Sequence, residues 1–185
     1  MLTITIPKGE LYDDATSEFI NVKETVLCLE HSLVSISKWE AKWHKPFLDN
    51  REQKTYEEIL DYVRCMTITQ NVDPNAYRFL SNKNMDDIKS YIEDTMTATW
   101  FSDDKKKKSN SKKIITSEVI YYWMVSLQIP FECQRWHINR LLTLIRVCDE
   151  ENKSHSSKKN RSKKDFLSSR AALNAARKKQ MNTKG

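Results

Sequence analysis

Glycine and proline are the residues this sequence has least of: it contains two glycines and four prolines in 185 residues. Phosphate-binding loops and dinucleotide-binding folds depend on glycine, whose backbone can approach a ligand closely. The composition therefore disfavours enzymes built around a bound nucleotide. With few helix breakers and 30% charged residues, the chain is expected to be mainly α-helical.

Long apolar runs are also absent. No stretch reaches the roughly 18 apolar residues of a membrane-spanning helix, so we expect no transmembrane segment and no membrane association. The first residues, MLTITIPKGELYDD, lack the basic, apolar and small-residue regions of a signal peptide. We therefore expect a cytoplasmic protein with four reduced and buried cysteines, which are Cys28, Cys65, Cys133 and Cys148.

Charge is distributed unevenly along the chain. Residues 1–150 contain 20 Lys/Arg and 23 Asp/Glu, whereas residues 151–185 contain 11 and 2, which gives net charges of −3 and +9. We therefore expect a helical body, 1–150, and a basic tail, 151–185. Residues 151–164 lack apolar periodicity, which predicts a linker. Residues 165–179 predict a short helix that is marginal alone, so we expect a partly disordered tail.

The body is expected to begin with a small β-hairpin. Alternating apolar residues predict a strand at Leu2–Ile6, and residues 18–22 could be its partner. Apolar residues at helical spacing then predict a first helix over about 23–44, with Glu40 away from its apolar face. Further helices are predicted after the Thr55–Glu58 capping box, after the Asp73–Pro74 N-cap, and over 85–96.

The densest apolar segment is 115–148. Thr116 or Ser117 is expected to cap one helix, and a second helix should begin near Ile129–Pro130 and be apolar on most sides. Such a helix is either central to the fold or available to a partner. The aromatic side chains could simply fill the core, but the segment carries more of them than a small body readily hides. We predict a partner-binding face made of Tyr121, Tyr122, Trp123, Trp136, Arg140 and Leu144.

Two Cys/His pairs are the most specific candidate for a metal site in the sequence. In Cys28-x-x-His31 and Cys133-x-x-x-His137 a helix would place each pair on one face, and together they could form a Cys₂His₂ zinc site. The usual Cys-x-x-Cys element is missing and each cysteine lies among core positions, so we expect no metal and no cofactor. Paired carboxylates are adjacent in sequence and no nucleophile has a triad context, so we expect no catalytic residues and no enzyme.

Lysine-rich segments occur at 102–113 and in the tail. They could be solvated surface, or they could bind a phosphate backbone with strong salt dependence. Without 102–113 the body has a net charge of −7, which disfavours nucleic acid. If the two segments act together, the basic patch comprises Lys105, Lys106, Lys107, Lys108, Lys158, Lys159, Arg161, Lys163, Lys164, Arg170, Arg177, Lys178 and Lys179.

Four segments carry a family resemblance: HSLVSISKWEAKWHKPF (31–47), LDYVRCMTITQNVDP (60–74), YIEDTMTATWF (91–101) and SEVIYYWMVSLQIPFECQRWHINRLLTLIRVC (117–148). They resemble a family of small proteins from the structural modules of tailed phages and prophages, the tail assembly chaperones encoded upstream of the tape measure protein. The final segment DFLSSRAALNAARKKQ is also similar to the Arg-rich C-terminal ends of such proteins.

The resemblance implies a non-catalytic protein. Tail assembly chaperones coat the long hydrophobic tape measure protein in the bacterial host cytoplasm until tail tube subunits replace them, and they are typically absent from the mature virion. Many are made in two lengths by ribosomal frameshifting. The expected partners are therefore tape measure and tail tube proteins, and self-association stays open. The alternatives are a basic-tailed nucleic-acid-binding protein and a head–tail connector retained in the virion.

Overall fold

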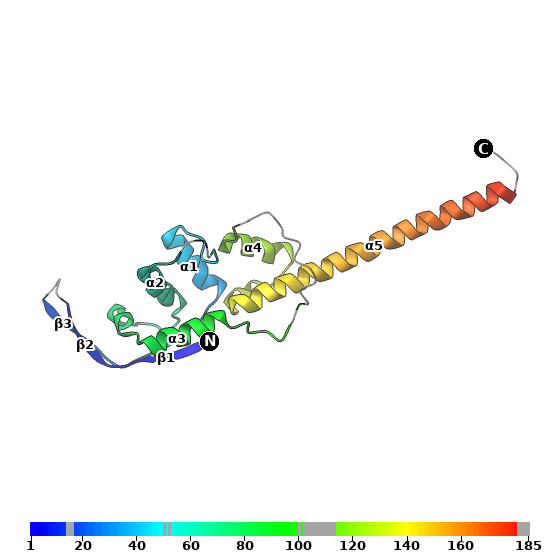
Figure 1. Ribbon diagram of the computed structural model, residues 1–185. Coiled ribbons are helices and arrows are strands. Elements are labelled where there is room, and N and C mark those ends of the chain that lie inside the picture. Colours follow the sequence, from blue (N-terminus) through cyan, green and yellow to red (C-terminus); the bar gives the residue numbers. More distant parts are fainter. Residues whose placement is uncertain (14–16, 50, 52, 100, 102–113, 181–185) are drawn as a thin grey trace. The chain divides into compact units, whose positions relative to one another are not determined.

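The computed structural model describes residues 1–13, 17–49, 51, 53–99, 101 and 114–180. The protein is rich in helix and has a small β-structure at its N-terminus (Figure 1). It divides into two compact units, residues 1–145 and 146–185, which are described separately. The predicted loop at 102–113 lies outside the described residues. Within the described chain, no helix is both long and apolar enough to cross a membrane.

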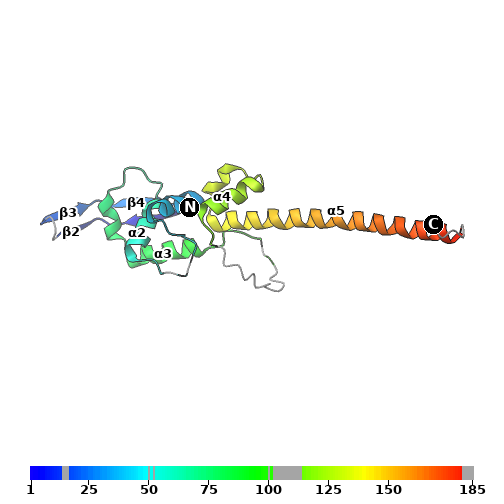
Figure 2. The same cartoon turned by 90° about the horizontal axis from the view of Figure 1, so that it is seen from above.

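The N-terminal hairpin is longer than the sequence predicted. Strand β1 (Leu2–Ile6) pairs antiparallel with β4 (Thr25–Leu29), and β2 (Gly9–Asp13) pairs antiparallel with β3 (Glu18–Val22). The strand at Leu2–Ile6 is confirmed, with Ile4 and Ile6 buried. Its predicted partner was wrong, because 18–22 pairs with β2 instead. Figures 1 and 2 show β2 and β3 beyond the ends of β1 and β4.

The predicted start of the first helix is also wrong, because Thr25–Leu29 is strand β4. Val26 and Leu29 are spaced as on one helical face, yet Val26 is 49% exposed and Leu29 is 0% exposed. Alternate residues of a strand point to opposite sides, so the segment has a period of two rather than 3.6. Its true inward side carries Leu27 and Leu29.

Helix α1 (Leu33–Trp43) begins where Ser32 accepts a hydrogen bond from the Ser35 amide, and it ends at His44 in a left-handed conformation. Helix α2 (Tyr56–Met66) packs against it. The capping box at the start of α2 is confirmed: Glu58 N–H donates to Thr55 Oγ1, and Thr55 N–H donates to Glu58 Oε2. These side chains satisfy amides that the first helical turn leaves unpaired.

Glu40 corrects a further prediction, because it is buried rather than solvated. Its Oε1 accepts from the Phe47 amide at 2.8 Å, and its Oε2 accepts from the Ser117 amide at 2.7 Å. Ser117 begins helix α4 (Ser117–Ser126), whose N-cap residue Thr116 makes no side-chain capping bond. A carboxylate of α1 therefore caps α4, and its negative charge suits that helix terminus.

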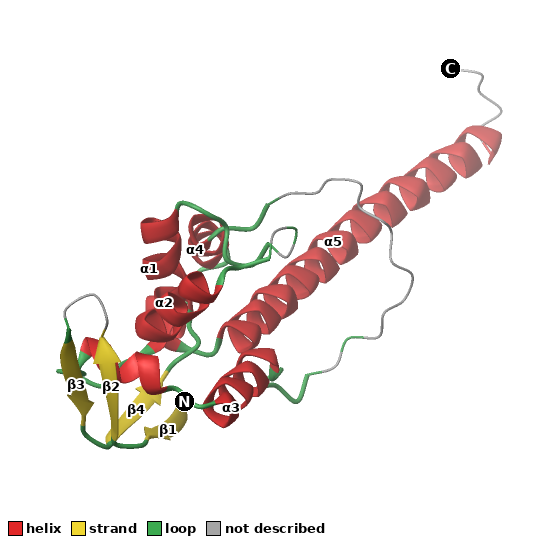
Figure 3. Ribbon diagram, turned by 60° about the vertical axis from the view of Figure 1, so that its left-hand side comes forward, coloured by secondary structure: helices red, strands yellow, loops and turns green. Residues whose placement is uncertain are grey.

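The 3₁₀ helix η1 (Pro74–Phe79) and helix α3 (Asn82–Glu93) pack against β1, as Figure 3 shows for α3. Asp73 caps η1 as predicted by accepting from the Asn75 amide at 2.8 Å. Helix α3 begins three residues before the predicted start at residue 85, because Ser81 caps it. It ends at Glu93 rather than at Met96.

The C-terminal part differs from the prediction in two ways. The segment after Pro130 forms the 3₁₀ helix η2 (Phe131–Arg135), and helix α5 (Ile138–Gln180) begins only afterwards. The structure gives one helix where the sequence predicted a linker at 151–164 and a short helix at 165–179. No glycine or proline interrupts 138–180. Ion pairs spaced four residues apart, Arg146–Glu150 and Asp149–Lys153, support the helix between residues 146 and 153.

Residues 28–32 form a junction between three distant parts of the 1–145 unit. The Ile68 amide donates to the Cys28 carbonyl and the Glu30 amide to the Met66 carbonyl, each at 2.9 Å. On the other side the Ile138 amide donates to the His31 carbonyl at 2.9 Å. The largest fully buried side chains of the described residues come from β1, β4, the junction, α1, α2, α4 and the start of α5, and they are Ile6, Leu27, Leu29, His31, Leu33, Ile36, Trp39, Met66, Ile120, Met124, Ile138 and Leu141.

Candidate functional site

Helix α4 presents apolar side chains to solvent. Ile120 and Met124 are buried, and α4 packs against α1. On another side of α4, Tyr122 is 67% exposed and Val125, one turn later, is 59% exposed. Phe131, the first residue of η2, is 55% exposed. We call Tyr122, Val125 and Phe131 the α4–η2 surface.

The other predicted partner-binding residues are less accessible or differently placed. Tyr121 is half-buried, and its hydroxyl donates to Gln134 Oε1 at 3.0 Å, which ties α4 to η2. Trp123 is also half-buried. The sequence analysis named Tyr122 but missed Val125 and Phe131. Val125 could have been found, because it lies three residues after Tyr122 and so shares its side of the helix.

Arg140 and Leu144 lie in the first turns of α5, and Trp136 lies just before it, at the end of η2. The Arg140 guanidinium is 4.1 Å from the centroid of the Trp136 ring, a cation–π contact, and Arg140 is exposed. Trp136 and Leu144 are half-buried. Arg140 and Leu144 therefore lie one turn apart on α5, and Trp136 lies before the helix begins.

The predicted basic patch falls in two places. Lys105–Lys108 lie outside the described residues. The remaining positions lie in α5, and Arg170 and Arg177 among them are exposed. Because one of the two lysine-rich segments lies outside the described residues, their cooperation stays a prediction.

A buried pair of histidines lies beside the junction. The rings of His31 and His137 have centroids 4.9 Å apart and meet edge to face. His31 Nδ1 is hydrogen-bonded to the Tyr62 hydroxyl at 2.5 Å. His137 Nε2 donates to the Tyr91 carbonyl at 2.9 Å, and its Nδ1 accepts from the Asn139 amide at 3.3 Å. One nitrogen of His137 donates and the other accepts, as a neutral imidazole requires.

Burial governs the titration of this pair. Desolvation, with a smaller contribution from His137, lowers the pKa of His31 to about 3. Desolvation also lowers the pKa of His137. Burial raises the pKa of Tyr62 well above its ordinary value. The cluster is therefore uncharged near neutral pH, and protonation of either ring opposes its burial.

The two Cys/His sequence pairs did not predict this arrangement. The histidines of both pairs meet, but Cys28 Sγ lies 3.9 Å from Thr3 Oγ1, and Cys133 is buried in η2. Among the described residues, no three His, Cys, Asp or Glu side chains are grouped so that they could hold a metal ion. The four cysteines are free thiols, but the prediction that all are buried was wrong, because Cys28, Cys65 and Cys148 are half-buried.

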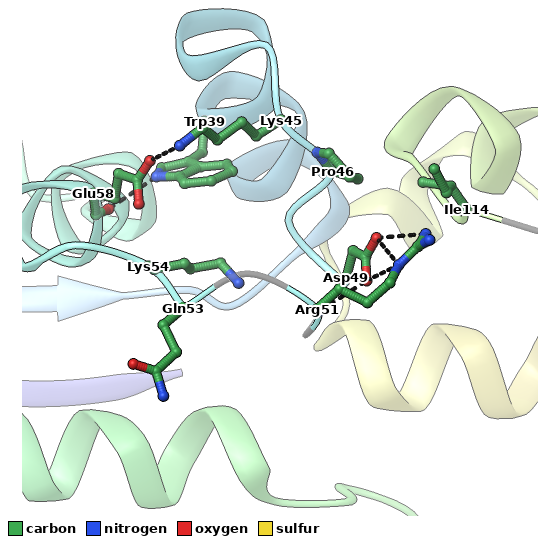
Figure 4. Close-up of a pocket in the computed structure, with 9 residues that line it drawn as sticks. All are labelled: Trp39, Lys45, Pro46, Asp49, Arg51, Gln53, Lys54, Glu58 and Ile114. Carbon is green, nitrogen blue, oxygen red and sulfur yellow. Dashed lines mark hydrogen bonds and ion pairs between the residues drawn. The ribbon is translucent and has the colours of Figure 1, made fainter. Parts of the chain in front are cut away.

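A pocket of about 350 Å³ opens between α1, the start of α2 and the segment before α4 (Figure 4). Its lining comprises Trp39, Lys45, Pro46, Asp49, Arg51, Gln53, Lys54, Glu58 and Ile114. Lys45 Nζ is 2.7 Å from Glu58 Oε1, and an Arg51 guanidinium nitrogen is 2.7 Å from Asp49 Oδ2. Hydrogen bonds lower the pKa of both carboxyls, from Lys45 to Glu58 and from Arg51 to Asp49.

Lys54 is the remaining charged residue of the pocket. Its Nζ lies 4.7 Å from the centroid of the Phe47 ring and 5.9 Å from that of Trp39. Lys54 also lines a second cavity of about 300 Å³, together with His31, Phe47, Leu48, Ile59, Tyr62, Ile92 and Asn139. Sequence reasoning missed Lys54, because one lysine before a helix cap carries no signal of its surroundings.

Comparison with known proteins adds no family to these observations. No protein-family model matches the sequence, and no curated protein and no solved structure matches the chain. The function is therefore argued from the residues, their geometry and the sequence resemblance.

Proposed function

We propose that this protein is a non-catalytic tail assembly chaperone that binds the phage tape measure protein through the α4–η2 surface. The sequence resemblance supplies the class of protein. The observation that carries the proposal is the exposure of Tyr122, Val125 and Phe131. Tyr122 and Val125 belong to α4, and another side of this helix is already buried in the core through Ile120 and Met124.

The size of this surface fits transient capture. Burying an apolar side chain of this size contributes about 1.5–3 kcal/mol, so three such side chains contribute several kcal/mol. Association itself costs a comparable amount in lost translational and rotational freedom. One copy would therefore bind weakly, while many copies along a long apolar helical protein would keep it soluble. Weak individual contacts would also let tail tube subunits displace the chaperone.

Co-expression with the tape measure protein of the same phage, followed by pull-down at low and high salt, tests the proposal. We expect a soluble complex that survives high salt, since apolar contacts are not screened. The double variant Tyr122→Glu/Val125→Glu should lose the complex while its melting temperature stays near that of the wild type. Tyr56→Glu is the matched control, because Tyr56 is also largely exposed but lies at the start of α2.

Nucleic-acid binding through the basic tail is the second candidate, supported by the net charge of +9 over residues 151–185. It predicts retention on DNA that falls steeply between low and high salt. Salt-sensitive DNA retention without a tape measure complex would replace the chaperone proposal. A complex together with recovery of the protein from purified virions would instead indicate a head–tail connector.

A further inference from the structure

Lys54 carries a positive charge that the pocket around it does not neutralise. The other two cations of the lining, Lys45 and Arg51, are ion-paired with Glu58 and Asp49. Among the described residues, no carboxylate lies within ion-pair distance of the Lys54 ammonium. Figure 4 shows this side chain extending between the two ion pairs. The described residues of the lining therefore carry one positive charge in excess.

The Lys54 ammonium is held in place without an anion. Its contact with the Phe47 ring and its proximity to Trp39 orient it through the negative faces of the rings. Burial at this position lowers the pKa of Lys54, and the nearby carboxylates of Glu58 and Asp49 only partly oppose that effect. A partly desolvated ammonium gains more from a bound anion than a fully hydrated one does.

We propose that this pocket binds a carboxylate attached to an apolar group. The carboxylate would accept hydrogen bonds from Lys54 Nζ, and the apolar group would lie against Trp39, Pro46 and Ile114, which supply the apolar part of the lining. This site goes beyond the proposed chaperone function and shares no residue with the α4–η2 surface.

The charges of the described lining residues favour a ligand with a single negative charge. Among the described residues, three cations and two carboxylates line the pocket, so one added carboxylate balances their charges. A phosphate monoester carries a second charge near neutral pH and would meet the carboxylates of Glu58 and Asp49. Its repulsion by these groups disfavours it. A carboxylate could come from a free organic acid or from the C-terminus of a bound polypeptide, and the two share this chemistry.

Calorimetric titration of the full chain with 3-phenylpropionate tests the proposal, with 3-phenylpropionamide as the neutral analogue of the same shape. We expect the acid to bind at least about tenfold more tightly than the amide, the factor that one charge-assisted hydrogen bond supplies. Lys54→Met should weaken the acid by a similar factor and leave the amide unchanged. Lys83→Met is the matched control, because Lys83 is exposed on α3 outside the pocket.

The comparison of acid with amide uses the wild-type protein, so it decides the matter even where Lys54→Met is unstable. Equal affinity for the two, no binding of the acid, or tighter binding of phenyl phosphate would overturn the proposal. An acetylated dipeptide ending in phenylalanine, with a free or an amidated C-terminus, distinguishes the sources. Tighter binding of the free-acid dipeptide than of 3-phenylpropionate would assign the site to a polypeptide terminus, and weaker binding would assign it to a free acid.

Discussion

Replacement of His31 by glutamine should remove much of the protein's sensitivity to mild acid. The pKa of His31 is lowered from 6.5 to about 3 in the folded state. In the unfolded chain this histidine takes up a proton as the pH falls below about 6.5, while the folded protein keeps it neutral. Its contribution to stability is therefore complete above pH 6.5 and is lost progressively as the pH falls toward 3.

The size of the effect follows from the two pKa values. Between pH 7 and pH 5 the unfolded state gains about 2 kcal/mol from protonating this one side chain, and the folded state gains almost nothing. The carboxyls of Glu58 and Asp61 stay ionised in the folded protein over this range. Burial raises the pKa of Asp61, but its hydrogen bonds from Lys42 and Trp43 together with nearby cations outweigh that effect. The hydrogen bond from Lys45 lowers the pKa of Glu58. His137, whose pKa burial also lowers, contributes in the same direction and is present in both proteins.

Urea unfolding followed by circular dichroism at pH 7 and pH 5 measures the difference. Wild-type protein should lose about 2 kcal/mol more than His31→Gln between the two pH values, whatever the absolute stability of the variant. His44→Asn is the control, since His44 is exposed and Asn tolerates its left-handed backbone conformation. The reasoning fails if His31→Gln and wild type lose the same free energy.

Three further perturbations test the packing. Glu40→Gln should destabilise the protein by about 1–3 kcal/mol in urea unfolding, because Ser117 loses a charged cap; an unchanged midpoint would show that the buried carboxylate does not cap α4. Gly9→Ala should cost about 1–3 kcal/mol, because a Cβ would lie 2.5 Å from ring carbons of Phe79; equal melting temperatures would mean that the ring moves freely. Truncation after Asn152 should leave cooperative thermal unfolding, since the 1–145 unit contains the buried apolar side chains of the described chain; a broad transition would contradict this.

The local signals in the sequence were reliable where a few neighbouring residues decide the structure. The Thr55–Glu58 capping box and the Asp73 N-cap lie where the sequence predicted them. The predictions failed where distant segments decide. Thr25–Leu29 carries apolar residues compatible with either period, and its pairing with β1 selects the strand.

In the candidate sites, too, what local sequence decides could be predicted and what distant contacts decide could not. The aromatic-rich segment was enough to name Tyr122 as a binding residue, but its exposure depends on how α4 packs. Glu40 reads as an ordinary surface residue of a helix, and only the arrival of Ser117 from a distant part of the chain makes it a buried cap. Lys54 becomes notable only because Phe47 and Trp39 lie beside it. Each of these depends on tertiary contacts that no local pattern encodes.

The junction at residues 28–32 also constrains when the body can finish folding. The chain is synthesised from its N-terminus, so the early hairpin and helices α1 and α2 can form before Ile138 exists to donate its amide to the His31 carbonyl. Until then, α1 lacks its contacts with α4 and η2, and closing so long a loop is slow compared with local helix formation. Newly made chains thus pass through a stage in which one side of α1 is uncovered.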